Sequence, residues 1–212
     1  MDSREKILGK LKVYKVTTSS KRKIVRPDII KGSLEKFSLK AEQVGANVWI
    51  AKNINEAQDM LIGILTKLEG NIVYSTDPIL NEINLFKLLR NHARGALEAA
   101  IDSVSNYKSS IYTYKVGITG CLYAISDSGS LVMAHSNNNE KLLSMAPEHH
   151  ICILKKEQIL ENKYILARII EEETRLPSAY SIITGISRNT DIMLPEVKGM
   201  HGPKSLDIIV IK

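Results

Sequence analysis

Residues 116 to 135 read VGITGCLYAISDSGSLVMAH and place small, hydroxylated residues around a single carboxylate, Asp127. The small residues are Thr119, Gly120, Ser128, Gly129 and Ser130. Turn amides and hydroxyls can form a concavity that binds anions, and glycine lets backbone approach a ligand closely. A carboxylate there can act as an acid, a base or a hydrogen-bond acceptor. The alternative is a tight turn between strands, where Gly, Ser and Asp are common for local reasons.

A second polar cluster lies near the C-terminus, in ITGISRNTDIMLPEVKGMHGPKSLDIIVI. Its candidate residues are Ser187, Arg188, Asp191 and His201. Arg188 can hold a carboxylate or phosphate in a bidentate fork that Asp191 orients, and His201 can shuttle a proton near neutral pH. An Arg–Asp pair that fixes a loop, with a histidine capping a turn, is the alternative. Because open α/β sheets bind ligands at strand ends, we expect the two clusters to share one crevice.

Several sharper motifs are absent from the sequence. It has no G-x-x-x-x-G-K-[ST] phosphate loop and no G-x-G-x-x-G fingerprint, and Ser128 does not lie in G-x-S-x-G. The adjacent His149 and His150 would point to opposite faces of a strand, which disfavours a shared metal ion. The two cysteines, Cys121 and Cys152, cannot supply the four thiolates that an iron–sulfur cluster usually takes. Any such cluster that serves this protein must therefore lie on a partner.

The composition favours one globular domain in a reducing compartment. The chain has 212 residues, of which 44% are hydrophobic and 25% are charged, which suffices for one substantial core. No apolar run approaches the roughly 20 residues that span a bilayer, and the N-terminal stretch lacks the apolar segment of a signal peptide. With only two cysteines, a disulfide framework is not expected, and we predict a cytoplasmic protein.

The net charge of +6 is concentrated at the N-terminus. Residues 1–40 hold 12 Lys and Arg against four Asp and Glu, whereas the remaining residues hold 17 against 19. This basic segment can dock an acidic partner, or it can be a solvated arm without a specific role. Aromatic residues make up only 5% of the chain, and no aromatic-rich RNA-binding strand is present, which weighs against nucleic acid.

The hydrophobic spacing predicts the elements that must position these clusters. We predict helices at 3–12, 27–45, 53–70 and, with a break, 77–105, and strands at 46–52 and 71–75. Further short strands are predicted at YTYKV, LYAI, SLVMA, HHICIL, YSIIT and LDIIVI, with one more helix at 157–174. Alternating helices and strands indicate an α/β fold, with a mostly parallel sheet covered by helices and an N-terminal helical extension.

Several of these motifs together resemble the LUD domain, the lactate-utilisation protein C family. The likeness rests on VGITGCLYAISDSGSLV, APEHHI, TGISRNTDI and KGMHGPKSLDIIVI, and RPDIIKGSLEKFSLKAEQVGANVWIA resembles the family's opening helix and strand. It covers residues 24–212 and leaves residues 1–23 as a basic N-terminal helix and loop. The resemblance implies an α/β fold related to the CoA-transferase and ribose-phosphate-isomerase group.

The resemblance also implies a role beside iron–sulfur partner subunits in oxidising L-lactate to pyruvate. In the related transferases an acid before a glycine at a strand end carries chemistry, and Asp127 stands at the most comparable place. The sequence departs from the family pattern at Ser128-Gly129-Ser130, which is usually Thr-Gly-Thr, and at four further positions. These are Lys141, Ile186, Asn189 and Met193, which replace an arginine, a proline, a threonine and an acid.

Three functions are therefore compatible with the sequence. The first is an accessory subunit of a lactate-oxidising complex, which binds a small organic acid or an anionic cofactor of unspecified identity. The second is a stand-alone enzyme that acts on a phosphorylated or CoA-linked metabolite. The third is a non-catalytic assembly module. A homo-oligomer is compatible with each of them.

Overall fold

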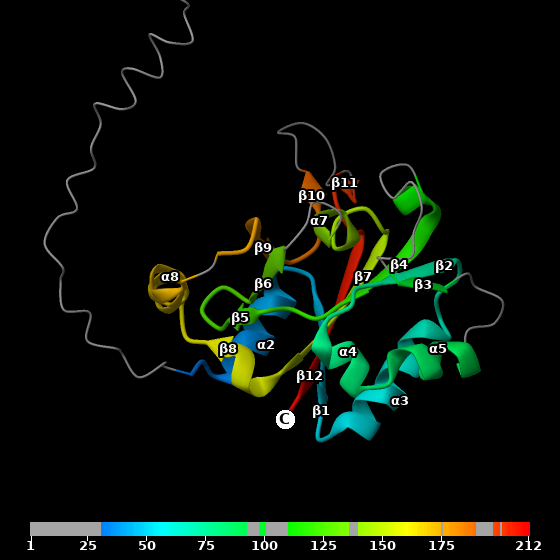
Figure 1. Cartoon of the computed structure of the whole chain (residues 1–212), viewed down its shortest axis with the longest axis horizontal. Coiled ribbons are helices and arrows are strands. Elements are labelled where there is room, and N and C mark those ends of the chain that lie inside the picture. The colour runs from blue at the N-terminus through cyan, green and yellow to red at the C-terminus, as the bar shows by residue number, and fades with distance from the viewer. Residues whose placement is uncertain are drawn as a thin grey trace, which may run out of the picture.

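The computed structural model describes residues 31–92, 98–100, 110–135, 140–174, 176–189, 197–199 and 201–212. The predicted helix at 3–12 and most of the basic N-terminal segment lie outside the described residues, as does Asp191. Within the described ranges, the chain folds into a parallel sheet with helices on both faces and a second, smaller sheet on one of them (Figure 1).

The main sheet has six strands in the order β1-β12-β7-β4-β2-β3, and every neighbouring pair is parallel. Its strands are β1 (Asn47–Ala51), β2 (Asn71–Tyr74), β3 (Glu98–Ala100), β4 (Tyr114–Thr119), β7 (His149–Lys155) and β12 (Ser205–Ile211). The central strands are buried on both faces, which explains their nearly continuous apolar sequences. The predicted α/β fold with a mostly parallel sheet is confirmed.

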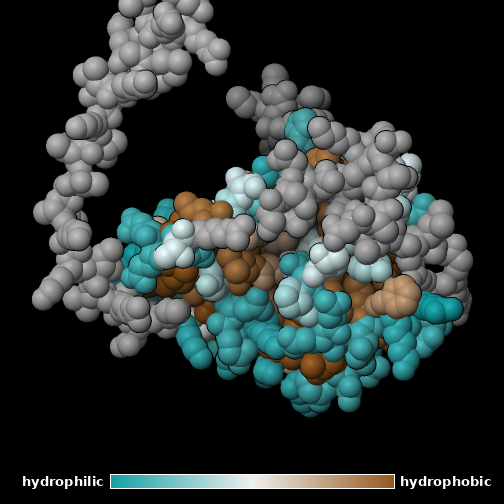
Figure 2. Space-filling view, viewed as in Figure 1, coloured by the Kyte–Doolittle hydropathy of each residue, from teal (hydrophilic) through white to brown (hydrophobic). Residues whose placement is uncertain are grey.

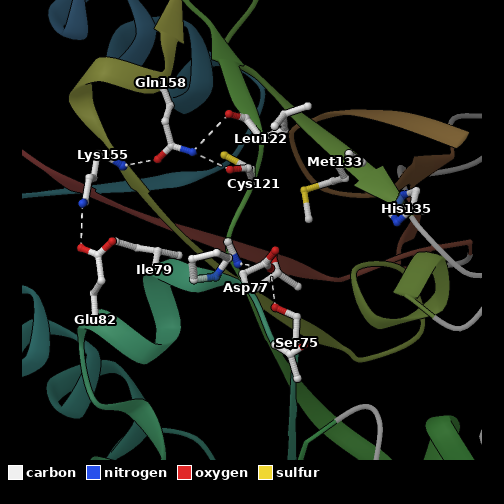
Figure 3. Close-up of a pocket in the computed structure, with 15 residues that line it drawn as sticks. Ser75, Asp77, Ile79, Glu82, Cys121, Leu122, Met133, His135, Lys155 and Gln158 are labelled. Carbon is white, nitrogen blue, oxygen red and sulfur yellow. Dashed lines mark hydrogen bonds and ion pairs between the residues drawn. The ribbon is translucent and has the colours of Figure 1, made fainter. Parts of the chain in front are cut away.

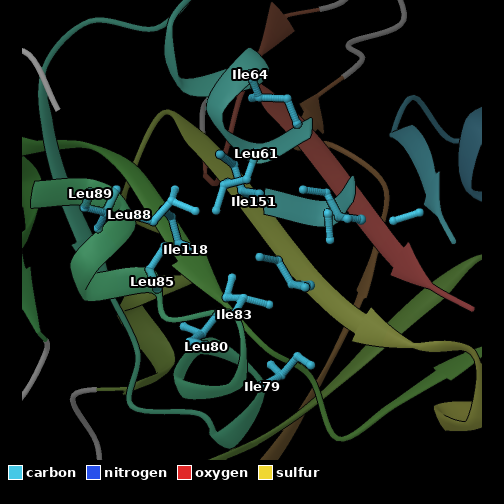
Figure 4. Packing of buried hydrophobic residues seen from close by; sticks show 14 of the residues in the cluster. Leu61, Ile64, Ile79, Leu80, Ile83, Leu85, Leu88, Leu89, Ile118 and Ile151 are labelled. Atoms are coloured by element: carbon cyan, nitrogen blue, oxygen red, sulfur yellow. The ribbon is translucent and has the colours of Figure 1, made fainter. Parts of the chain in front are cut away.

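Three helices cover one face of this sheet, namely α3 (Ile54–Leu65), α4 (Pro78–Glu82) and α5 (Leu85–His92). Leu61 of α3 and Leu89 of α5 are buried in one cluster with Ile118 and Ile151 of the sheet (Figure 4). The outer surface of these helices is mostly hydrophilic (Figure 2), as expected for helices that bury one face only.

The opposite face of the main sheet is covered by α2 (Leu34–Gln43) and by a four-stranded sheet in the order β8-β5-β6-β9. Phe37 of α2 and Leu131 of the smaller sheet are buried in a second cluster with Cys152, Leu154 and Ile208 of the main sheet. The strands of the smaller sheet are β5 (Tyr123–Ile125), β6 (Ser130–His135), β8 (Ile159–Leu160) and β9 (Ala179–Thr184). The remaining elements are α7 (Glu140–Leu143), α8 (Lys163–Glu172), β10 (Arg188–Asn189), β11 (Val197–Lys198) and 3-10 turns at Ile111–Thr113 and Lys156–Gln158.

The first described helix begins later than the sequence predicts. The prediction places a helix over 27–45, but α2 begins at Leu34, after Ser33, whose side chain accepts the Lys36 N–H at 3.1 Å. The preceding chain instead lies against β8, where the Gly32 N–H donates to the Ile159 carbonyl at 2.8 Å. This backbone contact outweighs the helical pattern of the segment, because local propensity is weak against tertiary context.

Two other boundaries differ from the prediction. The helical region predicted over 77–105 has its expected break at Asn84, which has φ 49°, but residues 98–100 form β3, a parallel neighbour of β2, instead of a helix. The helix predicted over 157–174 begins only at Lys163, because the Asn162 side chain caps it by accepting the N–H of Ile165 at 3.2 Å. Across the described residues, no helix combines the length and apolar character that a membrane crossing requires.

Candidate functional site

A pocket of about 490 Å³ opens at the carboxyl edge of the main sheet, beside the ends of β2 and β4 (Figure 3). After β2 the chain runs outward through α4 and α5 to β3, whereas after β4 it runs the other way, through β5 and β6, to β7. Neighbouring parallel strands whose connections leave in opposite directions form a topological switch point, where open α/β sheets bind ligands. Residues 75–79, 119–122 and 133–135 line the pocket, together with Glu82, Lys155 and Gln158.

The Asp77 carboxylate joins the ends of two strands inside this pocket. It follows β2, and its Oδ2 accepts the Gly120 N–H at 2.8 Å and the hydroxyl of Ser75. Gly120 follows β4 and has no room for a side chain, since a Cβ there would lie 2.8 Å from Ile79 Cγ2. Within the described ranges Asp77 Oδ1 has no hydrogen-bond partner, so it can accept a hydrogen bond from a ligand.

Lys155 and Gln158 form the opposite wall of the pocket (Figure 3). Lys155 Nζ lies 2.6 Å from Glu82 Oε2, and both side chains are 42% exposed. Because exposed ion pairs are weak, this lysine can exchange its partner for the carboxylate of a ligand. Gln158 Nε2 donates to the Cys121 carbonyl at 2.6 Å, and Gln158 Oε1 accepts the Lys155 N–H at 2.7 Å. Gln158 therefore fixes the loop after β4.

Cys121 lies at the pocket wall and is partly exposed. Its contact with the Cys152 thiol, its burial and the nearby charge of Asp77 raise the pKa of the Cys121 thiol well above its usual range. A thiol that stays protonated is a poor nucleophile, so the arrangement disfavours thiolate catalysis at this position.

A measurable consequence is slow alkylation of Cys121. At pH 8 iodoacetamide is expected to modify this thiol at least several-fold more slowly than it modifies free cysteine, because the thiolate fraction is small. Cys152→Ala removes the neighbouring thiol and is expected to speed the reaction. Mass spectrometry of time points measures both rates, and Cys121→Ser identifies the modified site. Equal rates for the native protein and the Cys152→Ala variant would contradict the contact between the two thiols.

The structure places Thr119 and Gly120 in the pocket but Asp127 outside it. Asp127 is exposed in the hairpin turn between β5 and β6, and its N–H donates to the Glu161 carbonyl at 3.2 Å. Gly129 in the same turn has φ 67°, and a Cβ there would lie 2.3 Å from the Ala41 amide nitrogen of α2. The glycine thus allows the turn to pack against a helix. A ligand-binding role for Asp127 stays a prediction.

Strand pairing brings the two predicted clusters next to each other. Ser130 of β6 pairs with Thr184 of β9, and their hydroxyl oxygens are 2.8 Å apart. Ser128 Oγ lies 2.8 Å from Ser130 Oγ, so the hydroxyls form a short chain. These residues do not line the pocket between β2 and β4. Ligand binding by the hydroxyls of Ser128 and Ser130 therefore stays a prediction.

The later part of the second cluster is only partly described. The His201 N–H donates to Ser187 Oγ at 3.3 Å, so these two residues do meet. Arg188 is exposed, and a Cβ on Gly45 would lie 2.3 Å from its Nη2, which places the guanidinium beside the end of α2. Asp191, its predicted partner, lies outside the described residues. The predicted roles of Ser187, Arg188 and His201 stay predictions.

Asp77, Lys155 and Gln158 are not among the site residues that the sequence predicts. A signal for Asp77 was present, because it follows directly on the predicted strand NIVYS, and the carboxyl end of a parallel strand is where ligands bind. Lys155 and Gln158 lie in the charged stretch KKEQ, which has no feature that distinguishes it from a solvated surface.

A second polar group lies at the opposite, amino edge of the main sheet. Ser205 Oγ lies 2.7 Å from His149 Nδ1, and His149 Nε2 lies 2.5 Å from Asp207 Oδ2. This order of contacts resembles a Ser–His–Asp catalytic triad. The Ser205 N–H, however, already donates to the Glu148 carbonyl at 3.3 Å, so it is not free to stabilise an oxyanion.

This group instead ties three neighbouring strands together. Trp49 of β1 donates from Nε1 to Asp207 Oδ1 of β12 at 2.6 Å, while His149 belongs to β7. Burial alone would raise the pKa of Asp207, but hydrogen bonds from His149 and Trp49 outweigh it and hold this pKa below its usual value. The group therefore stabilises the sheet edge. Among the described residues, no cluster of three or more His, Cys, Asp and Glu could hold a metal ion.

The fold and the pocket together define an α/β protein with a crevice at the carboxyl edge of a parallel sheet. The family model of the LUD domain matches residues 34–211, so the chain belongs to the LUD-domain family. A solved structure supports the same fold: the crystal structure of a DUF162 family protein from Deinococcus radiodurans has a TM-score of 0.52 and 19% identity. The match covers 84% of this chain and 96% of that one.

Several curated relatives match parts of the chain. It is 32% identical over 95 residues to Lactate utilization protein C of Deinococcus radiodurans, covering 44% of this chain and 45% of that protein. It is 31% identical over 150 residues to Lactate utilization protein C of a Geobacillus species, covering 67% and 62%. It is 29% identical over 148 residues to the YkgG protein of Escherichia coli, covering 68% and 64%. The matches thus span less than two thirds of each relative's length.

Proposed function

We propose that the chain serves lactate utilisation as a component without an iron–sulfur cluster, which binds a small organic acid in the pocket between β2 and β4. The position of this pocket at the topological switch point is the observation that carries the proposal. Similarity to relatives named Lactate utilization protein C supports the metabolic role. Iron–sulfur partner subunits would then accept the electrons, because two cysteines cannot ligate a four-thiolate cluster.

The polar groups of the pocket suit a 2-hydroxy acid. Asp77 Oδ1 is available to accept the hydroxyl hydrogen bond, and Lys155 can pair with the carboxylate after releasing Glu82. A hydrogen bond to a charged group contributes about 1.5–3 kcal/mol, so the loss of either contact should be measurable as weaker binding. In this arrangement the chain supplies binding and a hydrogen-bond acceptor, while another subunit supplies the redox centre.

The proposal is tested by ligand-induced thermal stabilisation of the protein with L-lactate and pyruvate. The matched variants are Asp77→Asn, which changes the pocket carboxylate, and Asp127→Asn, which changes the exposed carboxylate of the hairpin turn. We expect L-lactate to bind the Asp77→Asn variant about tenfold or more weakly and the Asp127→Asn variant normally. The reverse result would place the ligand at the hairpin turn. Absence of stabilisation in the native protein would contradict the proposal.

The volume of the pocket favours an alternative function, that of a stand-alone enzyme for a phosphorylated or CoA-linked metabolite. About 490 Å³ lies within the range of sites for drug-sized ligands and leaves room for more than a three-carbon acid. A stand-alone enzyme for a phosphorylated or CoA-linked metabolite would use that room, although the supporting fold analogy is a weak argument for function. Adding sugar phosphates and CoA esters to the same measurement tests this alternative. Stabilisation by these ligands only would favour it, and stabilisation by none of them would favour an assembly role.

A further inference from the structure

The two ring nitrogens of His150 on β7 lie in different surroundings. The side chain is fully buried, and its Nε2 lies 2.8 Å from Thr119 Oγ1. Its Nδ1 is also buried and has no hydrogen-bond partner among the described residues. Burial and, secondarily, the neighbouring His149 lower the pKa of His150 to about 3. The ring is therefore neutral near pH 7, and a single proton resides on one of its nitrogens.

The buried Nδ1 distinguishes the two neutral tautomers. If Nδ1 carried the proton, a buried N–H group would have no acceptor, and such unpaired donors are rare and costly in proteins. If Nε2 carries the proton, the ring donates to Thr119 Oγ1 and no donor is left unpaired. The geometry therefore favours the Nε2–H tautomer for His150.

This tautomer leaves the hydroxyl proton of Thr119 available. Thr119 ends β4, is 2% exposed and lines the pocket. Its oxygen accepts from His150, so its own proton can be donated elsewhere. Two other donors in the pocket already have acceptors within the protein. The Ser75 hydroxyl donates to Asp77, and the Gln158 amide donates to the carbonyls of the loop after β4, so neither competes with Thr119 for a ligand oxygen.

We propose that His150 is a positioning residue that directs the Thr119 hydroxyl proton into the pocket, where Thr119 selects ligands that present an acceptor oxygen. The inference rests on the proposed function and deepens it, since it assigns a hydrogen-bonding polarity to the same pocket. The ligand class it favours is a carboxylate or 2-oxo acid whose oxygen accepts from Thr119. A group that can only donate, such as an ammonium, is disfavoured at this point.

The first test needs no ligand. Long-range proton–nitrogen NMR correlations of the ¹⁵N-labelled full chain at pH 7 distinguish the two neutral tautomers of a histidine ring. The signals of His150 are identified by their loss in a His150→Gln variant. We expect the Nε2–H pattern. The Nδ1–H pattern would overturn the inference, whatever the pocket binds.

The second test measures the affinity of the same protein for pyruvate and L-lactate. Thr119→Ser keeps the hydroxyl, whereas Thr119→Val keeps the shape and removes it. We expect the serine variant to bind within about threefold of the native protein and the valine variant to bind about tenfold or more weakly. Equal binding by the native and valine proteins would overturn the role of Thr119. Failure of the native protein to bind either acid would instead contradict the proposed function, while the NMR spectrum still decides the tautomer.

Discussion

Acidification from pH 7.5 to pH 5 is expected to remove about 2 kcal/mol of the free energy of unfolding through His150 alone. Burial, with a smaller contribution from His149, lowers the pKa of this histidine from 6.5 to about 3 in the folded protein. In the unfolded chain the ring binds a proton below about pH 6.5, whereas in the folded protein it stays neutral down to about pH 3. The unfolded state therefore binds more protons in this window, and stability falls as the pH falls.

Urea unfolding followed by circular dichroism at half-unit pH steps measures this dependence. The window stays above pH 5, so that the carboxylates contribute little to the slope. A His150→Gln variant has no titrating ring at this position and is expected to lose most of the slope. His201→Gln removes an exposed histidine instead and serves as the matched control, which should keep it. Identical slopes for the native protein and the His150→Gln variant would show that His150 does not cause the dependence.

Replacement of Gly129 by alanine is expected to lower the free energy of unfolding by about 2–5 kcal/mol. Gly129 has φ 67°, a conformation that L-residues rarely adopt, and a Cβ there would lie 2.3 Å from the Ala41 nitrogen and 2.5 Å from the Lys40 carbonyl carbon. These are backbone atoms of α2, so the helix would have to move away from the β5–β6 turn. Strain and displacement then both destabilise the fold.

A Gly63→Ala variant is the matched control for this substitution. Gly63 lies within α3, and a Cβ there would meet no atom within 4 Å. Alanine at this position is expected to stabilise the protein by about 0.5–1 kcal/mol, because it reduces the freedom of the unfolded chain and favours the helix. Thermal and urea unfolding measure both variants. A Gly129→Ala variant as stable as the native protein would contradict the close packing of the turn on α2.

Local sequence patterns determined much of the architecture. The short apolar runs at 47–51, 71–74 and 205–211 form strands where predicted. The run at 205–211 is buried, as suits a central strand of a sheet covered on both faces, whereas 47–51 forms the partly exposed edge strand. Asn53 caps α3 as expected, with its side chain accepting the Glu56 N–H at 3.0 Å. The motifs around Asp127 and before the last strand identified the family, since they are specific as a combination. These features depend on residues close together in the chain.

Tertiary structure alone decided where the pocket lies and which side chains face it. Asp77 and Gly120 are 43 residues apart, and they meet because β2 and β4 are parallel neighbours that end at the same edge. Residues 98–100 form a strand, although the sequence favoured a helix, because pairing with β2 outweighs local propensity. Periodicity reports which face of an element is buried, but strand order is set by contacts between distant segments. The sequence could therefore predict polar clusters at strand ends, whereas only the folded chain could bring particular ends together.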